Sequence, residues 1–264
     1  MKYLVIGLGN TGLSIISMLK HAGLEVEGYN RPGKTLDNLK SIKEFNVEGL
    51  VDFAFKNDFI NEDLQKALTR SDFVFVCIPA NEHKGLANSI LESKLEEKMP
   101  SIISVPGRIF GAINFAEYLG TSVAEADTVP YAARHDGKAL ISLLAKKNKI
   151  LYSSTDISLL KSIEKKMPAF FKEIFYKENN YQKVTMSNVG LVLHCTPLLF
   201  NAGLIHHPQD FLFYKELISK EIAFYMQKID DERISISKEL GFSVKSVPVW
   251  LHEQYGTKDY SNIY

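Results

Sequence analysis

The sequence predicts an α/β protein, in which an N-terminal Rossmann-type doubly wound sheet is followed by an all-helical C-terminal domain. In the first half, short β-branched or aromatic runs alternate with helical patterns and end in Gly or Pro turns, as parallel strands joined by helices do. Beyond Lys183, apolar residues recur only at helical spacing. We therefore expect an NAD(P)-binding domain over residues 1–182 and a helical catalytic domain over residues 183–264.

The composition excludes several classes of protein. Of the 264 residues, 45% are hydrophobic and 23% are charged, which is ordinary for a soluble globular protein. The 31 basic residues balance the 31 acidic ones, so no overall charge attracts nucleic acid or an anionic membrane. The sequence shows neither an apolar run of membrane-spanning length nor a signal peptide, and two cysteines make no disulfide framework. We expect a cytoplasmic protein without nucleic-acid or membrane partners.

The first thirty residues predict a strand, a glycine turn, a helix and a second strand. Lys2–Ile6 is a buried-strand pattern that runs directly into a GxGxxG motif, and Glu25–Tyr29 is the next strand. In this context Gly7 makes the tight turn, Gly9 lets the backbone approach a pyrophosphate, and Gly12 packs the helix against the strand. The N-terminus of the helix then offers free N–H groups to the phosphates. The predicted cofactor-binding residues of this turn are Gly7, Gly9, Asn10, Thr11 and Gly12.

The end of the second strand favours NADP over NAD. Most NAD enzymes place an Asp or Glu about 20 residues past the glycines, where it holds the ribose hydroxyls. Here Asn30, Arg31 and Lys34 occupy this region, so the acid is missing and two cations are present. A guanidinium binds a 2′-phosphate in a bidentate manner, whereas a carboxylate repels it. We predict that these three residues bind NADP; the alternative is that both cations are solvated loop charges.

Two later strands end in turns that contain proline. Residues 72–78 form a continuous apolar run, typical of a parallel strand, before Pro79–Ala80. Residues 101–105 form the next strand, before Pro106–Gly107. Because ligands bind at the carboxyl edge of open α/β sheets, we predict that Pro79, Ala80, Pro106 and Gly107 contact the cofactor. The other expected elements are helices in 61–69, 82–95, 110–118 and 154–166, short strands in 47–55 and 121–125, and strands in 129–151 that extend the same sheet.

An apolar stretch of the second half, residues 187–203, contains three polar residues of interest. If this stretch is one helix, His194 and Asn201 share a face, because seven residues make almost two turns. Gly190 lies one turn before His194 and leaves room for a bulky partner. Pro197 is expected to kink the helix and free a carbonyl of the preceding turn. The imidazole is either a core histidine bonded to backbone or a functional group.

Two further helices are expected, over residues 211–240 and 247–255. Because the helical half is short for independent stability, we predict a homodimer that buries apolar residues from 211–222. The adjacent His206 and His207 come without a third ligand in the pattern, so we expect no metal site.

Five motifs follow one another along nearly the whole chain: Gly7–Gly12, Val105–Arg108 with Gly111–Ala112, Ala124–Glu125 with Tyr131–Arg134, Asn188–His194 with Asn201–Gly203, and Asp230–Arg233 with Gly241. In this order they resemble the GxGNxG turn, the NPGR…GG segment, the AET…YACR stretch, the NVxxHPxxxLLNAG helix and the DxER…LG helix of the opine dehydrogenase family. That family includes octopine, nopaline and related N-carboxyalkyl amino acid dehydrogenases. The helical motifs are the more specific ones, since few other families place a histidine in that helix.

The resemblance implies a reductive condensation of two small substrates, an amino acid and a 2-oxo acid. The amine adds to the oxo group, water leaves, and NADPH delivers a hydride to the imine. By this resemblance His194 is the general acid/base and faces the nicotinamide pocket, because a free imidazole titrates near neutral pH. Gly190 leaves room for nicotinamide or substrate, and Asn201 hydrogen-bonds a substrate carboxylate.

The chain departs from the family pattern at two points. Cys195 stands where the family has a proline after the histidine. Family members also continue beyond the point that matches Tyr264, and the resemblance places there an Asp that orients the histidine. We expect either a shortened form or another acid in that role, for which Asp230 and Asp231 are the candidates at a motif position.

Two alternative functions remain at this stage. A ketopantoate- or hydroxyacid-type NADP reductase shares the sheet and the helical half, but it typically uses a lysine in the equivalent helix. Residues 186–203 contain no lysine, which argues against that class. The other alternative is a non-catalytic, nucleotide-sensing Rossmann protein, which the missing partner of His194 keeps open.

Overall fold

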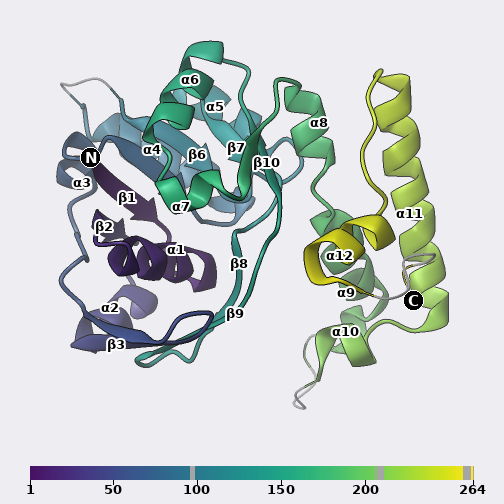
Figure 1. Cartoon of the computed structure of the whole chain (residues 1–264), viewed down its shortest axis with the longest axis horizontal. Helices are drawn as coiled ribbons and strands as arrows, with labels where there is room; N and C mark the ends of the chain where they lie inside the picture. Colours follow the sequence, from purple (N-terminus) through teal and green to yellow (C-terminus); the bar gives the residue numbers. More distant parts are fainter. Residues whose placement is uncertain (96–98, 205, 207–210, 258–262, 264) are drawn as a thin grey trace. The chain divides into compact units, whose positions relative to one another are not determined.

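The computed structural model describes residues 1–95, 99–204, 206, 211–257 and 263 of the chain (Figure 1). Two compact units are present, Met1–Tyr181 and Gln182–Tyr264, and the division lies one residue before the predicted boundary. The first unit contains the sheets and the second is helical. The predicted fold class, a Rossmann-type sheet followed by a helical part, is confirmed.

The main sheet of the first unit has seven strands in the order β11-β10-β7-β6-β5-β1-β2. Their bounds are β1 (Lys2–Ile6), β2 (Glu25–Tyr29), β5 (Phe73–Val76), β6 (Ser101–Ser104), β7 (Ala124–Ala126), β10 (Ile150–Ser153) and β11 (Phe175–Lys177). Five neighbouring strands, β2, β1, β5, β6 and β7, run parallel to one another. Strand β10 pairs with β7 in the antiparallel direction. The chain therefore leaves β2, β1, β5, β6 and β7 at one common edge of the sheet, the edge at which the predicted cofactor residues lie.

Helices cover both faces of this sheet, because side chains along each strand alternate between two buried cores (Figure 1). In β1, Tyr3 and Val5 enter one core, and Leu4 and Ile6 enter the other. The first core takes α1 (Asn10–His21), α6 (Ile157–Lys166) and α7 (Ala169–Lys172); the second takes α3 (Leu64–Thr69), α4 (His83–Glu92) and α5 (Gly111–Leu119). This is the doubly wound arrangement that the sequence predicts.

A second sheet of four strands corrects one expectation. Its order is β4 (Phe53–Lys56), β3 (Glu44–Gly49), β9 (Leu140–Lys146) and β8 (Tyr131–His135), with α2 (Lys34–Ser41) preceding β3. The prediction that residues 129–151 extend the main sheet is therefore wrong for β8 and β9, and only β10 does so. The reason is visible in β3 and β9, where Phe45, Val47, Ile141 and Leu143 are buried with α1 while alternate residues are not. Alternation of this kind belongs to a sheet with one covered face.

The helical unit corrects two further expectations. Its elements are α8 (Tyr181–Met186), a π-helical turn (Leu191–Cys195), α9 (Thr196–Phe200), α10 (Phe213–Glu216), α11 (Lys220–Glu239) and α12 (Val247–Tyr255). Residues 187–203 are not one helix, because the helix begins at Gly190 and contains the π turn. Residues 211–240 are not one helix either, because Ser219 caps a new helix by accepting a hydrogen bond from the Ile222 N–H. The predicted helix over 247–255 is confirmed as α12.

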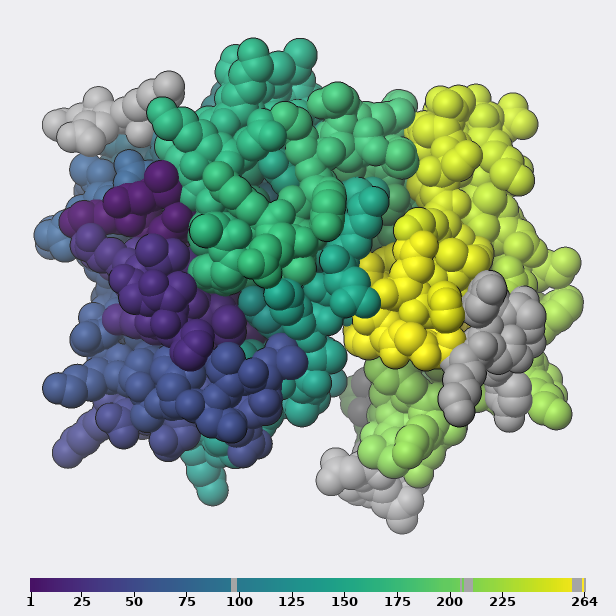
Figure 2. Space-filling model, in the orientation of Figure 1, coloured from purple at the N-terminus to yellow at the C-terminus, as the bar shows by residue number. Residues whose placement is uncertain are grey.

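The helical unit has its own small core. Val189, Val192 and Leu193 pack with Met226 of α11 and with Val247 and Trp250 of α12. In the space-filling view, the side chains of α12 form one continuous body with those of α11 (Figure 2). Within the described ranges, no helix is long and apolar enough to cross a membrane.

Candidate functional site

The glycine turn after β1 has steric surroundings that fit a dinucleotide. Gly7 has a φ of +96°, and a Cβ there would lie 2.6 Å from Ile78 Cγ2. A Cβ on Gly12 would lie 1.8 Å from the Gly7 carbonyl oxygen. A Cβ on Gly9, in contrast, would meet no described atom within 4 Å. Packing thus requires the first and third glycines, while the space over Gly9 is open for a ligand.

The N-terminus of α1 offers backbone donors beside that open space. Gly9 is the N-cap residue, and its carbonyl accepts from the Leu13 N–H at 2.9 Å. The N–H groups of the first turn, including those of Asn10 and Thr11, have no acceptor within the helix, so they suit an anion. The Asn10 side chain has a separate role, because its Oδ1 accepts from the His135 N–H of β8 at 2.9 Å. The pyrophosphate contact predicted for Asn10 stays a prediction, and it would have to use the backbone N–H.

The residues after β2 lie close to the same turn. Asn30 Oδ1 accepts from the Leu8 N–H at 3.1 Å, and thereby ties the end of β2 to the glycine turn. The Arg31 guanidinium forms a bidentate ion pair with Glu82, of which the Nη2–Oε1 contact is 3.3 Å. Lys34 is exposed and is the first residue of α2. Glu82 was not predicted as a partner of Arg31, although its position three residues after Pro79 places it at the ligand-binding edge.

The turns after β5 and β6 lie beside each other. Pro79 and Ala80 are exposed, and a Cβ on Gly111 would lie 3.5 Å from Ala80 Cβ. Pro106 is half-buried and Gly107 is buried. A Cβ on Gly107 would lie 2.2 Å from Glu125 Cβ. The close packing of the Glu125 side chain therefore requires a glycine at this position. The predicted cofactor contacts of these four turn residues stay predictions.

His83 joins these two turns and was missed by the sequence analysis. It is 1% exposed, its Nδ1 lies 3.0 Å from the Gly111 carbonyl oxygen, and its ring packs on Phe115. Burial lowers the pKa of His83 below its usual range, and the hydrogen bond to Gly111 opposes this shift. The neutral imidazole therefore donates from Nδ1 to Gly111 and holds the start of α5 against the start of α4.

His194 lies in the π turn of the helical unit. The Thr196 N–H bonds the Leu191 carbonyl five residues back, which widens the helix just before Pro197. The wider turn gives the proline ring room where it would otherwise clash with the preceding turn, and π turns occur frequently at functional sites. His194 is half-buried, and its Nδ1 lies 3.2 Å from the Tyr214 hydroxyl of α10. A phenol contacts the ring where the family resemblance implies an acid.

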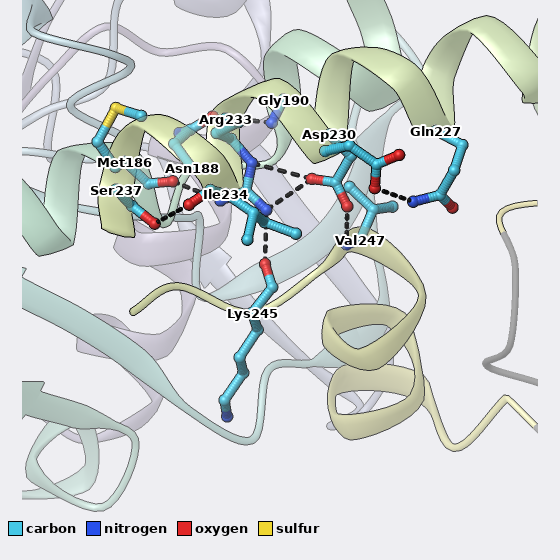
Figure 3. Close-up of polar contacts among 11 residues, drawn as sticks. Met186, Asn188, Gly190, Gln227, Asp230, Arg233, Ile234, Ser237, Lys245 and Val247 are labelled. Atoms are coloured by element: carbon cyan, nitrogen blue, oxygen red, sulfur yellow. Dashed lines mark hydrogen bonds and ion pairs between the residues drawn. The ribbon is translucent and has the colours of Figure 1, made fainter. Parts of the chain in front are cut away.

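Asp230 and Asp231, the two candidate acids, bond to other groups (Figure 3). Asp230 is fully buried and accepts from Arg233 Nε at 3.0 Å, from Arg233 Nη2 at 2.7 Å and from the Val247 N–H at 2.7 Å. Arg233 also donates to the carbonyls of Met186 and Lys245, both at 2.5 Å. The pair therefore joins α11 to the end of α8 and to the start of α12. Asp231 accepts from Gln227 Nε2 at 3.0 Å.

The two predicted substrate residues of the helical unit have local partners. Gly190 donates its N–H to Asn188 Oδ1 at 2.8 Å and starts the helix that holds His194 (Figure 3). Asn201 donates from Nδ2 to the carbonyls of Pro197 at 2.8 Å and Leu217 at 2.9 Å. Both Nδ2 hydrogens are thus bonded to backbone, and Asn201 ties the end of α9 to the end of α10. In this conformation it offers a substrate carboxylate no amide hydrogen.

Metal ligands do not gather in the part of the chain that the structure describes. No group of three or more His, Cys, Asp or Glu residues is close enough there to hold a metal ion. Of the adjacent pair considered from the sequence, His207 lies outside the described residues.

Two family models match the chain, one in its N-terminal part and one at its C-terminal end. Residues 2–106 match the family model of NADP oxidoreductases dependent on coenzyme F420, and residues 177–264 match the α-helical domain of NAD/NADP octopine/nopaline dehydrogenases. An opine dehydrogenase from Arthrobacter sp. (strain 1C) is 25% identical over 96% of this chain and 72% of its own length.

Solved structures agree with these sequence matches. Octopine dehydrogenase with NADH and L-arginine has a TM-score of 0.70 at 18% identity, and covers 100% of this chain and 72% of its own. NADP+-bound yersinopine dehydrogenase has a TM-score of 0.70 at 12% identity, with coverage of 97% and 68%. A ketopantoate reductase from Ralstonia eutropha shares the fold with a TM-score of 0.66 at 16% identity, with coverage of 93% and 77%.

A Rossmann-type sheet with an open glycine turn, followed by a helical domain of the octopine/nopaline type, defines an NAD(P)-dependent dehydrogenase of the class that acts on CH–NH bonds. The resemblance first seen in the sequence motifs is confirmed. The C-terminal part of the chain matches the octopine/nopaline dehydrogenase model, and the chain as a whole is similar to opine dehydrogenases in sequence and fold.

Proposed function

We propose that the protein is an NADP-dependent opine dehydrogenase that condenses the amine of an amino acid with a 2-oxo acid. The observation that carries this proposal is His194 in the π turn of the helical domain that matches octopine/nopaline dehydrogenases. The same stretch contains no lysine, which disfavours a ketopantoate-type reductase despite the shared fold. In the reaction, the amine and the oxo group form an imine and release water. Reduction of the imine then yields a secondary amine.

NADPH, when bound, supplies the hydride to the imine carbon. The protein then has to bind the phosphates, orient the substrates and move protons. We assign the pyrophosphate to the first N–H groups of α1 and to the open space over Gly9. We assign His194 as the general acid/base that protonates the departing hydroxyl during imine formation and accepts that proton again in the reverse direction. Its contact with Tyr214 restrains the ring that has to perform this transfer.

We propose that NADP is preferred over NAD. The ribose edge after β2 holds Asn30, Arg31 and Lys34, and only an amide stands where NAD enzymes place a carboxylate. Arg31 is the residue that we assign to the 2′-phosphate, because its planar fork matches the phosphate oxygens. The side chain of Arg31 is 73% exposed and accessible to a ligand.

The substrates that we propose follow from the family. Octopine dehydrogenase has been solved with L-arginine and with pyruvate. We therefore propose a free amino acid and a small 2-oxo acid as the substrate pair, in a cytoplasmic setting where both are available. Neither nucleic acid nor a membrane is part of the proposal, in accordance with the balanced charge.

We also propose a homodimer. Several large apolar side chains of the helical unit are exposed, among them Leu212 at 60% and Tyr214 at 54%. Exposed apolar side chains of this kind are what a subunit interface would bury. Light scattering at micromolar concentration is expected to give twice the mass of the 264-residue chain, and a monomer at that concentration would contradict the proposal.

The central experiment follows NADPH oxidation with a panel of amino acids combined with pyruvate or 2-oxoglutarate. We expect turnover with at least one pair, and a loss of about 10²- to 10⁴-fold in kcat for His194→Ala. His252→Ala removes another histidine of the same unit and is the matched control, expected to retain activity. Tight NADPH binding without turnover on any pair would instead identify a nucleotide-sensing protein.

A further inference from the structure

The ion pair between Arg31 and Glu82 places a carboxylate where the proposed cofactor contact is made. We propose that Glu82 is a specificity-determining residue, which competes with the 2′-phosphate of NADP for the Arg31 guanidinium and so moderates the preference for NADP. This inference rests on the proposed function of Arg31. It goes beyond that function by assigning a role to a residue on a different strand-to-helix connection.

The position of the pair supports this role. Arg31 follows β2, whereas Glu82 ends the short 3₁₀ turn Ala80–Glu82 that follows β5. In the sheet, β1 lies between β2 and β5, so the ion pair spans the carboxyl end of the strand that leads into the glycine turn. The ends of these strands form the edge where a dinucleotide binds in this fold. Glu82 is therefore a neighbour of the proposed adenosine site and not a remote surface charge.

The geometry of the pair makes the competition direct. Both terminal nitrogens of Arg31 contact a carboxylate oxygen of Glu82, and the longer contact is 3.3 Å. This is the fork geometry with which an arginine also binds a phosphate, so the same two N–H groups serve either anion. A 2′-phosphate that binds these same two N–H groups displaces at least one carboxylate oxygen. It is then held beside a carboxylate that remains anionic.

The exposure of the two side chains makes the exchange possible. The Arg31 side chain is 73% exposed and that of Glu82 is 32% exposed, so neither is locked by packing. Glu82 Oε1 also accepts from Asn81 Nδ2 at 3.4 Å, and this long hydrogen bond restrains the carboxylate only weakly. NAD, which has no 2′-phosphate, leaves the ion pair intact. The competition thus acts on NADP and not on NAD.

Removal of the charge of Glu82 tests the inference through binding alone. Calorimetric titration with NADPH, NADH, adenosine 2′,5′-bisphosphate and 5′-AMP gives dissociation constants for the wild type and for Glu82→Gln. We expect Glu82→Gln to tighten NADPH and adenosine 2′,5′-bisphosphate by about 3- to 10-fold, with NADH and 5′-AMP changed less than about twofold. The gain should shrink as salt is raised, because a partly exposed pair is screened.

A matched variant controls for loss of a surface carboxylate. Glu173 forms an exposed ion pair with Lys146 at 3.4 Å, and Glu173→Gln should leave all four dissociation constants unchanged. A thermal melt of each variant verifies that the fold is retained. Unchanged or weaker NADPH binding in Glu82→Gln overturns the inference. A selective loss of NADH binding also overturns it, because Glu82 would then be a ribose ligand.

Arg31→Gln separates this inference from the proposed function. If Arg31→Gln weakens NADPH selectively while Glu82→Gln has no effect, the role of Arg31 stands and the competition by Glu82 fails. If Arg31→Gln weakens NADPH and NADH equally, the 2′-phosphate role of Arg31 fails, and the inference about Glu82 fails with it.

Discussion

The molecule contains two acid–arginine pairs of similar chemistry in opposite environments. Arg31 and Glu82 form an exposed pair at the edge of the main sheet, whereas Asp230 and Arg233 form a pair that is 0% and 3% exposed inside the helical unit. An exposed ion pair contributes about 0–1 kcal/mol, since water competes for both partners. Loss of one partner of a buried pair costs about 3–5 kcal/mol, because the other charge is left without compensation. The exposed pair is therefore free to exchange for a ligand, and the buried pair is part of the fold.

This contrast changes how the sequence motif is interpreted. The Asp230–Arg233 segment resembles a family motif and was considered as the source of an acid for His194. In the structure, Asp230 accepts from the Val247 N–H and Arg233 donates to two backbone carbonyls, so the motif joins three segments of the helical unit. A motif can thus resemble that of a family through residues that join segments of the helical unit to one another.

The largest effect is expected from breaking the buried pair. Asp230→Asn leaves the Arg233 cation buried, and should lower the free energy of unfolding of the helical unit by about 3–5 kcal/mol. Urea denaturation followed by circular dichroism measures this loss. Asp231→Asn removes the neighbouring exposed carboxylate, which accepts from Gln227, and should change the stability by less than about 0.5 kcal/mol. Equal effects of the two substitutions would remove the distinction between the buried and the exposed acid.

The exposed pair should respond in binding and not in stability. Arg31→Asp places two carboxylates opposite each other and should weaken NADPH by about 10- to 100-fold, while NADH changes by less than about threefold. Fluorescence titration of both cofactors measures the ratio. Arg70→Asp, at another exposed arginine of the same unit, should leave the ratio unchanged. Equal weakening of NADPH and NADH would argue against a 2′-phosphate contact.

Local patterns predicted the parts of the fold in which neighbours along the chain decide the structure. The strand, glycine turn and helix of residues 2–21 follow from a short buried-strand run and from glycine sterics, and α12 coincides with the helix expected over residues 247–255. The second sheet could not be predicted in this way, since β3 pairs with β9 almost a hundred residues later. A strand pattern shows that a strand forms but not which partner it takes.

The same distinction between local pattern and tertiary contact applies to the candidate site. The glycines and Arg31 could be singled out from spacing, because each lies at a fixed distance from a strand end. The partner of Arg31 is Glu82 and the contact of His194 is Tyr214, and both pairs are brought together only by tertiary structure. The π turn was also missed, although Pro197 predicted a local disturbance, because its form depends on how the preceding turn packs.

A smaller effect is expected from the buried His83, in the pH dependence of the stability. Its pKa is lowered by burial, so below about pH 6.5 the unfolded chain binds a proton that the folded state excludes. Stability therefore falls as the pH drops through the unfolded value and levels off below the folded value. His83→Gln should reduce the loss of Tm between pH 7 and pH 5 by about 2–4 °C, as measured by calorimetry. His21→Gln, at an exposed histidine, is the control, and the same reduction in it would refute the assignment.

The contact between Tyr214 and His194 is intermediate in exposure between the Arg31–Glu82 pair and the Asp230–Arg233 pair. His194 is half-buried and Tyr214 is 54% exposed. A neutral hydrogen bond of this kind contributes about 0.5–1.5 kcal/mol, which corresponds to roughly 2- to 10-fold in rate if the bond is kept in the transition state. Tyr214→Phe should therefore lower kcat by that factor with little change in KM, because the hydroxyl positions the imidazole and binds no substrate. Tyr225→Phe removes the hydroxyl of another exposed tyrosine, whose ring stacks on Phe200, and should leave kcat unchanged. A rise in KM without loss of kcat in Tyr214→Phe would place the hydroxyl on the substrate instead.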